Sequence, residues 1–162
     1  MSNLEEIEAI KQLKYRYFRF LDSKMWEELG ECFTEDAVSA YSGGRWSFEG
    51  RAAIMEFLST ALSSENIVSM HQGHHPEIKI LDSEHAEGIW YLEDYVITVG
   101  GSAPELGADT ILHGAGFYHD EYVKVDGEWK FKHTGYERTF EEHQDRSKME
   151  GLSVTTRFLG KS

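Results

Sequence analysis

The chain has 162 residues, and its 16 Lys and Arg against 29 Asp and Glu give a formal net charge of −13. Apolar residues make up 40% of the chain and aromatic residues 13%, which suits a packed core and excludes a disordered segment. The acidic balance argues against nucleic acid or an anionic membrane surface as a partner, because phosphate recognition depends on clustered Lys and Arg. No apolar run reaches the roughly 18 residues that a membrane-spanning helix needs.

The first residues, MSNLEEIEAI, are acidic and amphipathic, so we expect no signal peptide and a cytoplasmic protein. Cys32 is the only cysteine, which excludes a disulfide or a thiolate metal cluster within one chain, and we expect it in the core. The pattern predicts one domain over residues 1–143 and a C-terminal tail over residues 144–162.

The first part of the chain has the three- and four-residue period of amphipathic helices. Its apolar positions are Ile7, Ile10, Leu13, Tyr17 and Phe20/Leu21. Asp22-Ser23 interrupts this pattern and predicts a second short helix carrying Trp26, Leu29 and Phe33. Gly43-Gly44 predicts a turn between two short segments, 38–41 and 45–48, and a third helix is expected over residues 54–62.

From Ile67 onward the apolar period changes to two, which is typical of strands. Strands are expected over residues 77–81, 86–99, 111–125 and 129–140, and Asp126-Gly127 is a hairpin signal between the last two. Helices followed by antiparallel strands predict an α+β domain, with the helices covering one face of a curved sheet around a pocket.

Three histidines fall within the segment SMHQGHHP, residues 69–76, and suggest a metal site. Their spacing matches no standard ligand pattern. Gly73 and Pro76 predict a turn here, with His74 and His75 as loop residues. His71 ends an apolar stretch, so it is either a core residue or a base.

Asp94 alternates with Trp90, Leu92 and Val96, which places a carboxylate on an apolar strand face. It needs a partner or a proton there, and it serves either a buried hydrogen bond or a polar contact inside a pocket. Arg138 lies an even number of residues after Lys130 and Lys132, so a regular strand would place all three side chains on one face. The strand must therefore bulge or switch faces before Arg138 can point inward.

Tyr17 and Asp22 are five residues apart, about 140° of rotation on an ideal helix. They share a cavity only if the helix ends near Leu21, and helix capping is the alternative role for Asp22. Phosphate loops, nucleophile elbows and CxxC pairs are absent from the sequence. A set of one His, two Asp, one Tyr and one Arg suits proton transfer without a cofactor or metal.

Read together, four segments resemble the bile acid 7α-dehydratases, which are SnoaL-like members of the nuclear-transport-factor-2-like superfamily. They are IEAIKQLKYRYFRFLDSKMWEEL, SMHQGHHPEIKI, GIWYLEDYV and GFYHDEYVKVDGEWKFKHTGYERTFEEH. The resemblance spans residues 7–143 and implies a cone-shaped α+β barrel, commonly a homotrimer. The sequence departs from the family pattern over residues 99–114, which we expect to form a loop near the pocket mouth.

The resemblance implies a cofactor-free dehydratase that removes water from a steroid-like hydroxy ketone, such as a 7α-hydroxy-3-oxo-Δ4 bile acid. His71 matches the family's base, Asp22 its partner and Tyr17 a hydrogen-bond donor to the reacting oxygens. Asp94 and Arg138 match residues that hold the substrate or support the other three. The alternatives are an isomerase or cyclase acting on a similar ketone, and a non-catalytic ligand-binding module.

Overall fold

The computed structural model describes residues 3–101 and 106–158. The helices are α1 (Asn3–Ser23), α2 (Trp26–Gly30), α3 (Arg51–Leu62) and the 3₁₀ turn η1 (Arg146–Lys148). The strands are β1 (Phe33–Tyr41), β2 (Trp46–Glu49), β3 (Ile67–Ile80), β4 (His85–Thr98), β5 (Thr110–Val125) and β6 (Glu128–Asp145). None of the helices in this part of the chain is long and apolar enough to cross a membrane.

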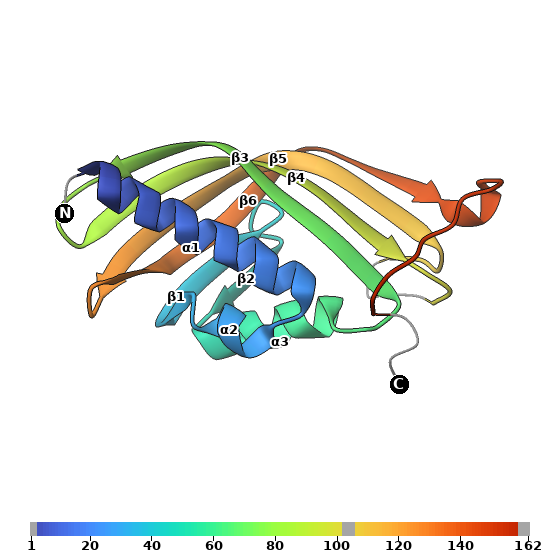
Figure 1. Cartoon of the computed structure of the whole chain (residues 1–162), viewed down its shortest axis with the longest axis horizontal. Coiled ribbons are helices and arrows are strands. Elements are labelled where there is room, and N and C mark those ends of the chain that lie inside the picture. The colour runs from blue at the N-terminus through green and yellow to red at the C-terminus, as the bar shows by residue number, and fades with distance from the viewer. Residues whose placement is uncertain (1–2, 102–105, 159–162) are drawn as a thin grey trace.

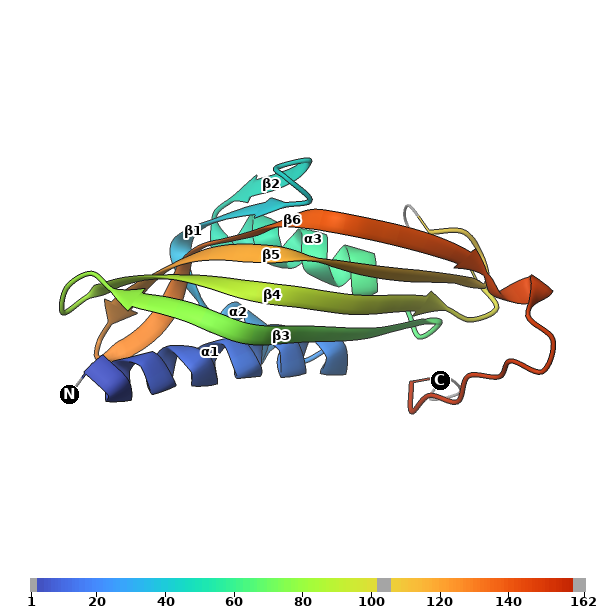
Figure 2. The same cartoon turned by 90° about the horizontal axis from the view of Figure 1, so that it is seen from above.

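The six strands form one curved sheet in the order β2-β1-β6-β5-β4-β3. Every pairing is antiparallel except that of β1 with β6. The sheet arches over the helices, with α1 and α3 beneath its inner face (Figure 1), and no helix among the described residues covers its outer face (Figure 2). The predicted α+β class and curved, mostly antiparallel sheet are confirmed, although the sheet stays open and does not close into a barrel.

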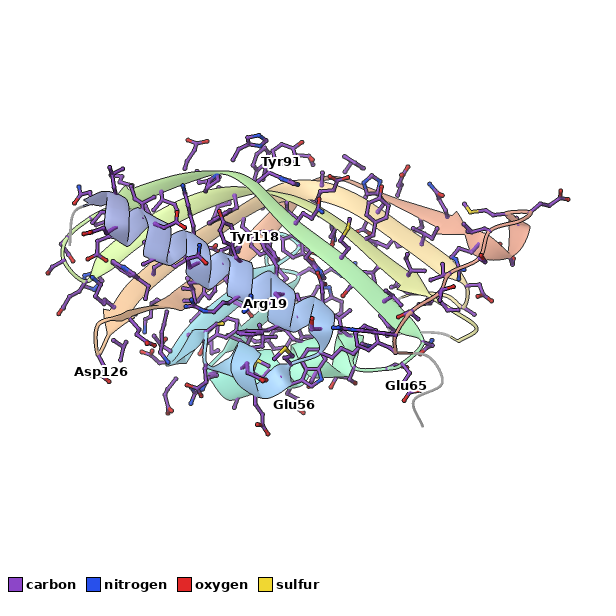
Figure 3. The ribbon with its side chains drawn as sticks, in the orientation of Figure 1. Arg19, Glu56, Glu65, Tyr91, Tyr118 and Asp126 are labelled. Carbon is purple, nitrogen blue, oxygen red and sulfur yellow. The ribbon has the colours of Figure 1, made fainter. Side chains whose placement is uncertain are left out.

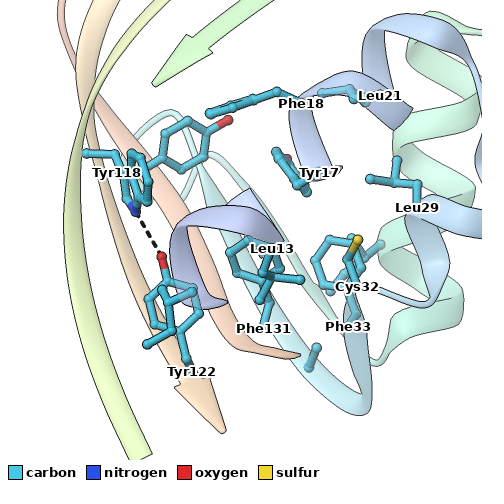
Figure 4. Packing of buried hydrophobic residues seen from close by; sticks show 14 of the residues in the cluster. Leu13, Tyr17, Phe18, Leu21, Leu29, Cys32, Phe33, Tyr118, Tyr122 and Phe131 are labelled. Carbon is cyan, nitrogen blue, oxygen red and sulfur yellow. Dashed lines mark hydrogen bonds between the residues drawn. The ribbon is translucent and has the colours of Figure 1, made fainter. Parts of the chain in front are cut away.

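The core lies between the inner face of the sheet and one stripe of α1. The stripe recurs every three or four residues and is buried throughout: Ile10, Leu13, Tyr17 and Leu21. Rings from the sheet meet it, among them Tyr118 and Phe131 (Figure 4). Each fully buried side chain of this size contributes about 1.5–3 kcal/mol, so this packing fixes α1 against the sheet.

Two local predictions are wrong. Phe33 begins β1 instead of belonging to the second helix, because the chain turns at Cys32, whose carbonyl accepts a hydrogen bond from Phe131 N at 2.8 Å. The predicted turn at Gly73 and Pro76, with His74 and His75 in a loop, lies within the continuous strand β3. A register shift between His74 and Glu77 absorbs the proline. Proline is tolerated there because β3 is an edge strand.

Two bulges in β6 set which of its side chains face inward. The register against β5 shifts opposite Glu121/Tyr122 and again opposite Ala115/Gly116. The first shift reverses the parity of β6, so that Phe131 and Thr134 are both buried although three residues apart. Arg138 therefore faces inward while Lys130 and Lys132 face outward, and the bulge that this required is confirmed.

Candidate active site

A cavity of about 590 Å³ lies between the sheet and the helices. This volume is typical of pockets that enclose drug-sized ligands. Apolar side chains form most of its wall, including Leu21 of α1, Phe57 of α3 and Leu112 of β5. Ser42, Arg45, Thr60, Glu141 and His143 also line it. The remaining polar lining residues are what we call the polar wall: Tyr17, Tyr41, His71, Asp94, Tyr118, Tyr136 and Arg138.

Asp22, in the last turn of α1, holds His71 of β3 through two separate contacts. The backbone N–H of His71 donates to Asp22 Oδ2 at 2.8 Å, and His71 Nδ1 lies 2.7 Å from Asp22 Oδ1. The Ser69 hydroxyl donates to the same Oδ1 at 2.8 Å. An ionised carboxylate at Nδ1 selects the tautomer with its proton on that nitrogen. His71 Nε2 therefore keeps its lone pair on the cavity side.

The electrostatics of this pair favour a charged carboxylate and a basic imidazole. Burial raises the pKa of Asp22, but the hydrogen bonds and charge of His71 outweigh it, and the net pKa is lowered. Burial lowers the pKa of His71, but Asp22 and then Asp94 act in the opposite direction, and the net pKa lies above its ordinary value of 6.5. His71 is thus a stronger base than an imidazole buried alone.

Asp94 and Arg138 form a buried, two-pronged ion pair beside His71. Arg138 Nη1 and Nη2 donate to Asp94 Oδ1 and Oδ2 at 2.6 and 2.8 Å, and the Asp94 side chain is only 3% exposed. Strand register places Asp94 directly opposite His71, and the two side chains approach to 3.9 Å between Nε2 and Oδ2. That separation exceeds a hydrogen bond, so Asp94 supplies charge to His71 and leaves Nε2 available to a ligand.

Gly114 makes the Arg138–Asp94 pair possible. It lies on β5 opposite Asp94, in the path of the guanidinium. A Cβ at position 114 would stand 2.4 Å from Arg138 Nη1 and 3.1 Å from the carbonyl oxygen of Phe140. A side chain at position 114 would therefore displace the guanidinium, and glycine serves close approach here and not an unusual backbone conformation.

The tyrosines of the polar wall are neutral hydrogen-bonding groups. Burial is the main cause that raises the pKa of Tyr17, Tyr41 and Tyr118 well above the ordinary value of 10. The buried Tyr41 hydroxyl has no partner of good hydrogen-bond geometry in the described structure. Neutral phenols that line a cavity are suited to donate to a ligand oxygen.

All five residues singled out from the sequence meet in this region. Tyr17, His71, Asp94 and Arg138 line the cavity, whereas Asp22 contacts His71 from behind. The helix runs on to Ser23, so the condition that it end near Leu21 is not needed: Tyr17 and Asp22 act on the site from different sides. Asp22 does not cap α2, whose N-cap is Met25.

Sequence reasoning missed the contributions of Ser69, Tyr118 and Tyr136. Tyr118 alternates with two further buried polar residues of β5, Asp120 and Tyr122, which is the same signal that identified Asp94. The divergent loop does reach the cavity, through Leu106, while residues 102–105 lie outside the described residues. The described His, Cys, Asp and Glu side chains include no group of three or more arranged to hold a metal.

Comparison with known proteins identifies the family to which this chain is similar. A model of the SnoaL-like domain matches residues 2–135. A "Putative Scytalone Dehydratase" from Novosphingobium aromaticivorans is similar in structure, with a TM-score of 0.71 and 28% identity over 88% of this chain and 89% of that one.

Two further structures share the fold at lower identity. A hexachlorocyclohexane dehydrochlorinase, LinA type 2, has a TM-score of 0.74 and 16% identity over 95% of each chain. A "putative aromatic ring hydroxylase" from Novosphingobium aromaticivorans has a TM-score of 0.75 and 20% identity over 89% of this chain and 96% of that one.

Proposed function

We propose, from the premise that this chain belongs to the SnoaL-like domain family, that it is a cofactor-independent carbon–oxygen lyase acting on a hydroxy ketone. The observation that carries the proposal is His71, whose Nδ1 is held by Asp22 while Nε2 faces a largely apolar cavity. This arrangement supplies an oriented base of raised pKa at the wall of a cavity of ligand size. The names of two structural relatives, a dehydratase and a dehydrochlorinase, describe eliminations of the same type.

The substrate that we propose is steroid-like, a 7α-hydroxy-3-oxo-Δ4 bile acid or a close analogue. The Δ4-3-ketone acidifies the C6 protons, because the carbanion delocalises through the enone to the 3-oxygen. A cavity of about 590 Å³ with one polar wall is large enough for a polycyclic ligand. The resemblance in the four segments described above supports this substrate class.

In the proposed reaction His71 Nε2 removes a C6 proton, and the C–H electron pair passes into a dienolate. The ketone then re-forms, the C6=C7 double bond is completed, and the C7–O bond breaks. His71 passes the proton that it removed to the departing hydroxide, so the products are a 4,6-dien-3-one and water, and the imidazole is neutral again. Asp22 and Asp94 stabilise the imidazolium formed between the two steps.

Tyr17 is proposed to donate a hydrogen bond to the developing enolate oxygen. Its raised pKa keeps the phenol protonated at neutral pH. A donor aimed at developing charge in a dry site typically contributes a few kcal/mol to the transition state. Arg138 is proposed to support the site by fixing Asp94, which leaves Asp94 charged beside His71.

The test is the growth of dienone absorbance, which lies to the red of the enone, with wild type and His71→Ala. Loss of a general base lowers the rate about 10²- to 10⁴-fold. His85→Ala is the matched control, because His85 makes the same kind of contact with Asp82, at 3.0 Å, at an exposed turn. Turnover that survives His71→Ala refutes the assignment of His71 as the base. A wild type that exchanges C6 protons without losing water indicates the isomerase alternative.

We also propose that copies of this chain associate through the outer face of the sheet. That face exposes Met70, Ile89, Tyr91 and Phe140 by 37–48% each, and Tyr91 stands on it in Figure 3. Large apolar side chains exposed on one open sheet face favour a protein partner. A homotrimer is the assembly that the sequence resemblance implies.

A further inference from the structure

Beneath the polar wall lies an ion pair that the proposed reaction does not use. Lys14 of α1 and Asp120 of β5 are both fully buried, and Lys14 Nζ donates to Asp120 Oδ2 at 2.7 Å. Replacing a buried pair of this kind by apolar residues is often neutral or stabilising, so stability alone does not account for it. Lys14 also occupies the apolar stripe of α1, one turn before Tyr17.

The carboxylate of Asp120 also accepts hydrogen bonds from two side chains of the sheet. Tyr122 donates to Asp120 Oδ2 at 2.8 Å, and Thr134 donates to Oδ1 at 2.7 Å. Trp90 Nε1 donates in turn to the Tyr122 hydroxyl at 2.9 Å, the bond drawn in Figure 4. Asp120 is therefore held in place and holds Lys14.

The ammonium faces the rings of two cavity tyrosines. Lys14 Nζ lies 3.4 Å from the ring centroid of Tyr118 and 5.1 Å from that of Tyr17. The two rings meet edge to face, 6.4 Å apart (Figure 4). Both line the cavity, whereas Lys14 and Asp120 do not. The cation thus lies behind the tyrosines, and a ligand would lie in front of them.

A cation over an aromatic face interacts most strongly where water is excluded, as it is around Lys14. It withdraws electron density from a phenol and favours negative charge developing at the hydroxyl. We propose that Lys14, held by Asp120, is a positioning residue that strengthens Tyr17 and Tyr118 as donors to an anionic ligand oxygen. The inference rests on the proposed function, in which that oxygen is the developing enolate.

Lys14 carries its charge at neutral pH. Burial lowers its pKa from 10.5 to about 8, with Asp120 acting in the opposite direction. The charged or titratable groups around it are Asp120, Tyr122, Tyr118 and Tyr17. Burial keeps the phenols protonated, and the charge of Asp120 raises the pKa of Tyr17 and Tyr118 further, so Lys14 acts on both phenols against the carboxylate that holds it.

The first experiment measures ligand ionisation and needs no turnover. 4-Nitrophenol, whose oxyanion absorbs to the red of the neutral form, is titrated into wild type and the double variant Lys14→Met/Asp120→Asn. The double variant removes both charges and so leaves neither buried alone. We expect wild type to bind the oxyanion in preference to the phenol, and the double variant to lose about 10- to 30-fold of that preference.

Lys124→Met is the matched control. Lys124 forms a comparable ion pair with Glu6 of α1, at 2.6 Å, and contacts Trp129 instead of the cavity tyrosines. We expect it to keep the wild-type preference. Equal oxyanion preference in wild type and the folded double variant overturns the proposal, and so does a wild type that prefers the neutral phenol.

Kinetics separate this role from a structural one. If Lys14 acts on developing charge, the double variant loses kcat by about 10- to 30-fold with little change in KM. An unchanged kcat in the folded double variant contradicts the proposal. If wild type dehydrates no steroid but retains a Lys14-dependent preference for nitrophenolate, the proposed function fails and the role of Lys14 stands.

Discussion

Replacing Asp22 by Asn tests how far the carboxylate, and not merely the shape of the side chain, activates His71. Asn is nearly isosteric and still accepts the backbone N–H of His71, but it carries no charge. The variant therefore lacks the charge-assisted hydrogen bond of 2.7 Å between Asp22 Oδ1 and His71 Nδ1. Such bonds contribute about 1.5–3 kcal/mol, so the rate is expected to fall about 10- to 150-fold.

The pH dependence gives Asp22→Asn a second, independent signature. The base must be neutral, so activity rises with pH as His71 loses its proton, and the wild-type acidic limb is expected above 6.5. Without the carboxylate, burial dominates and the pKa of His71 falls. The acidic limb of the variant therefore moves to lower pH while its plateau is reduced. The assay is the dienone absorbance followed across pH.

The stability of the fold depends on pH through the same pair. The raised pKa of His71 stabilises the fold below about pH 6.5, and this contribution is lost as pH rises through the folded value. The lowered pKa of Asp22 stabilises the fold at pH values above 3.8, its ordinary pKa. This contribution is lost as pH falls through the pKa of Asp22 in the folded protein. Both contributions are present near pH 5, where the variant is expected to melt roughly 3–12 °C below wild type, with a smaller difference near pH 9.

Asp82→Asn is the control for these measurements. Asp82 accepts from the backbone N–H of His85 at 2.9 Å and lies 3.0 Å from its Nδ1, which reproduces the Asp22–His71 contacts at an exposed turn. It should leave rate and acidic limb unchanged. An Asp22→Asn variant with wild-type kcat, or with an acidic limb that stays in place or moves upward, would refute our account of the pair.

Two further predictions address the shape of the site and the outer face. Gly114→Ala should displace Arg138 from Asp94. The free energy of unfolding, measured in urea, should then fall by about 3–5 kcal/mol, because a buried carboxylate loses its partner. Gly30→Ala is the control and should change this free energy little, because its new Cβ meets only a side-chain atom at 3.7 Å. Tyr91→Glu should reduce the assembled mass measured by light scattering, whereas Tyr15→Glu, at an equally exposed aromatic on α1, should not. A monomeric wild type, or a Gly114→Ala variant as stable as Gly30→Ala, would contradict the respective argument.

The sequence by itself determined the elements whose periodicity is strong. The stripe of α1 and the alternation around Asp94 predicted a helix, a strand and the buried faces of both, because burial repeats at 3.6 or 2 residues along regular structure. The hairpin at Asp126-Gly127 was equally local, and both residues have positive φ, 51° and 85°. Lys14 is a charge on the same apolar stripe, and sequence reasoning did not use that signal.

Only the tertiary structure decided which residues meet. Asp22 and His71 are 49 positions apart, and their contact depends on how α1 packs against β3. Asp94 and Arg138 are 44 positions apart, and their pairing depends on strand register. Arg138 reaches inward because a bulge in β6 reverses its parity, and Gly114 leaves room for it. Pro76 reads locally as a turn, yet an edge strand with a bulge accommodates it. Periodicity reports which face is buried, whereas register and bulges determine what each buried polar group finds there.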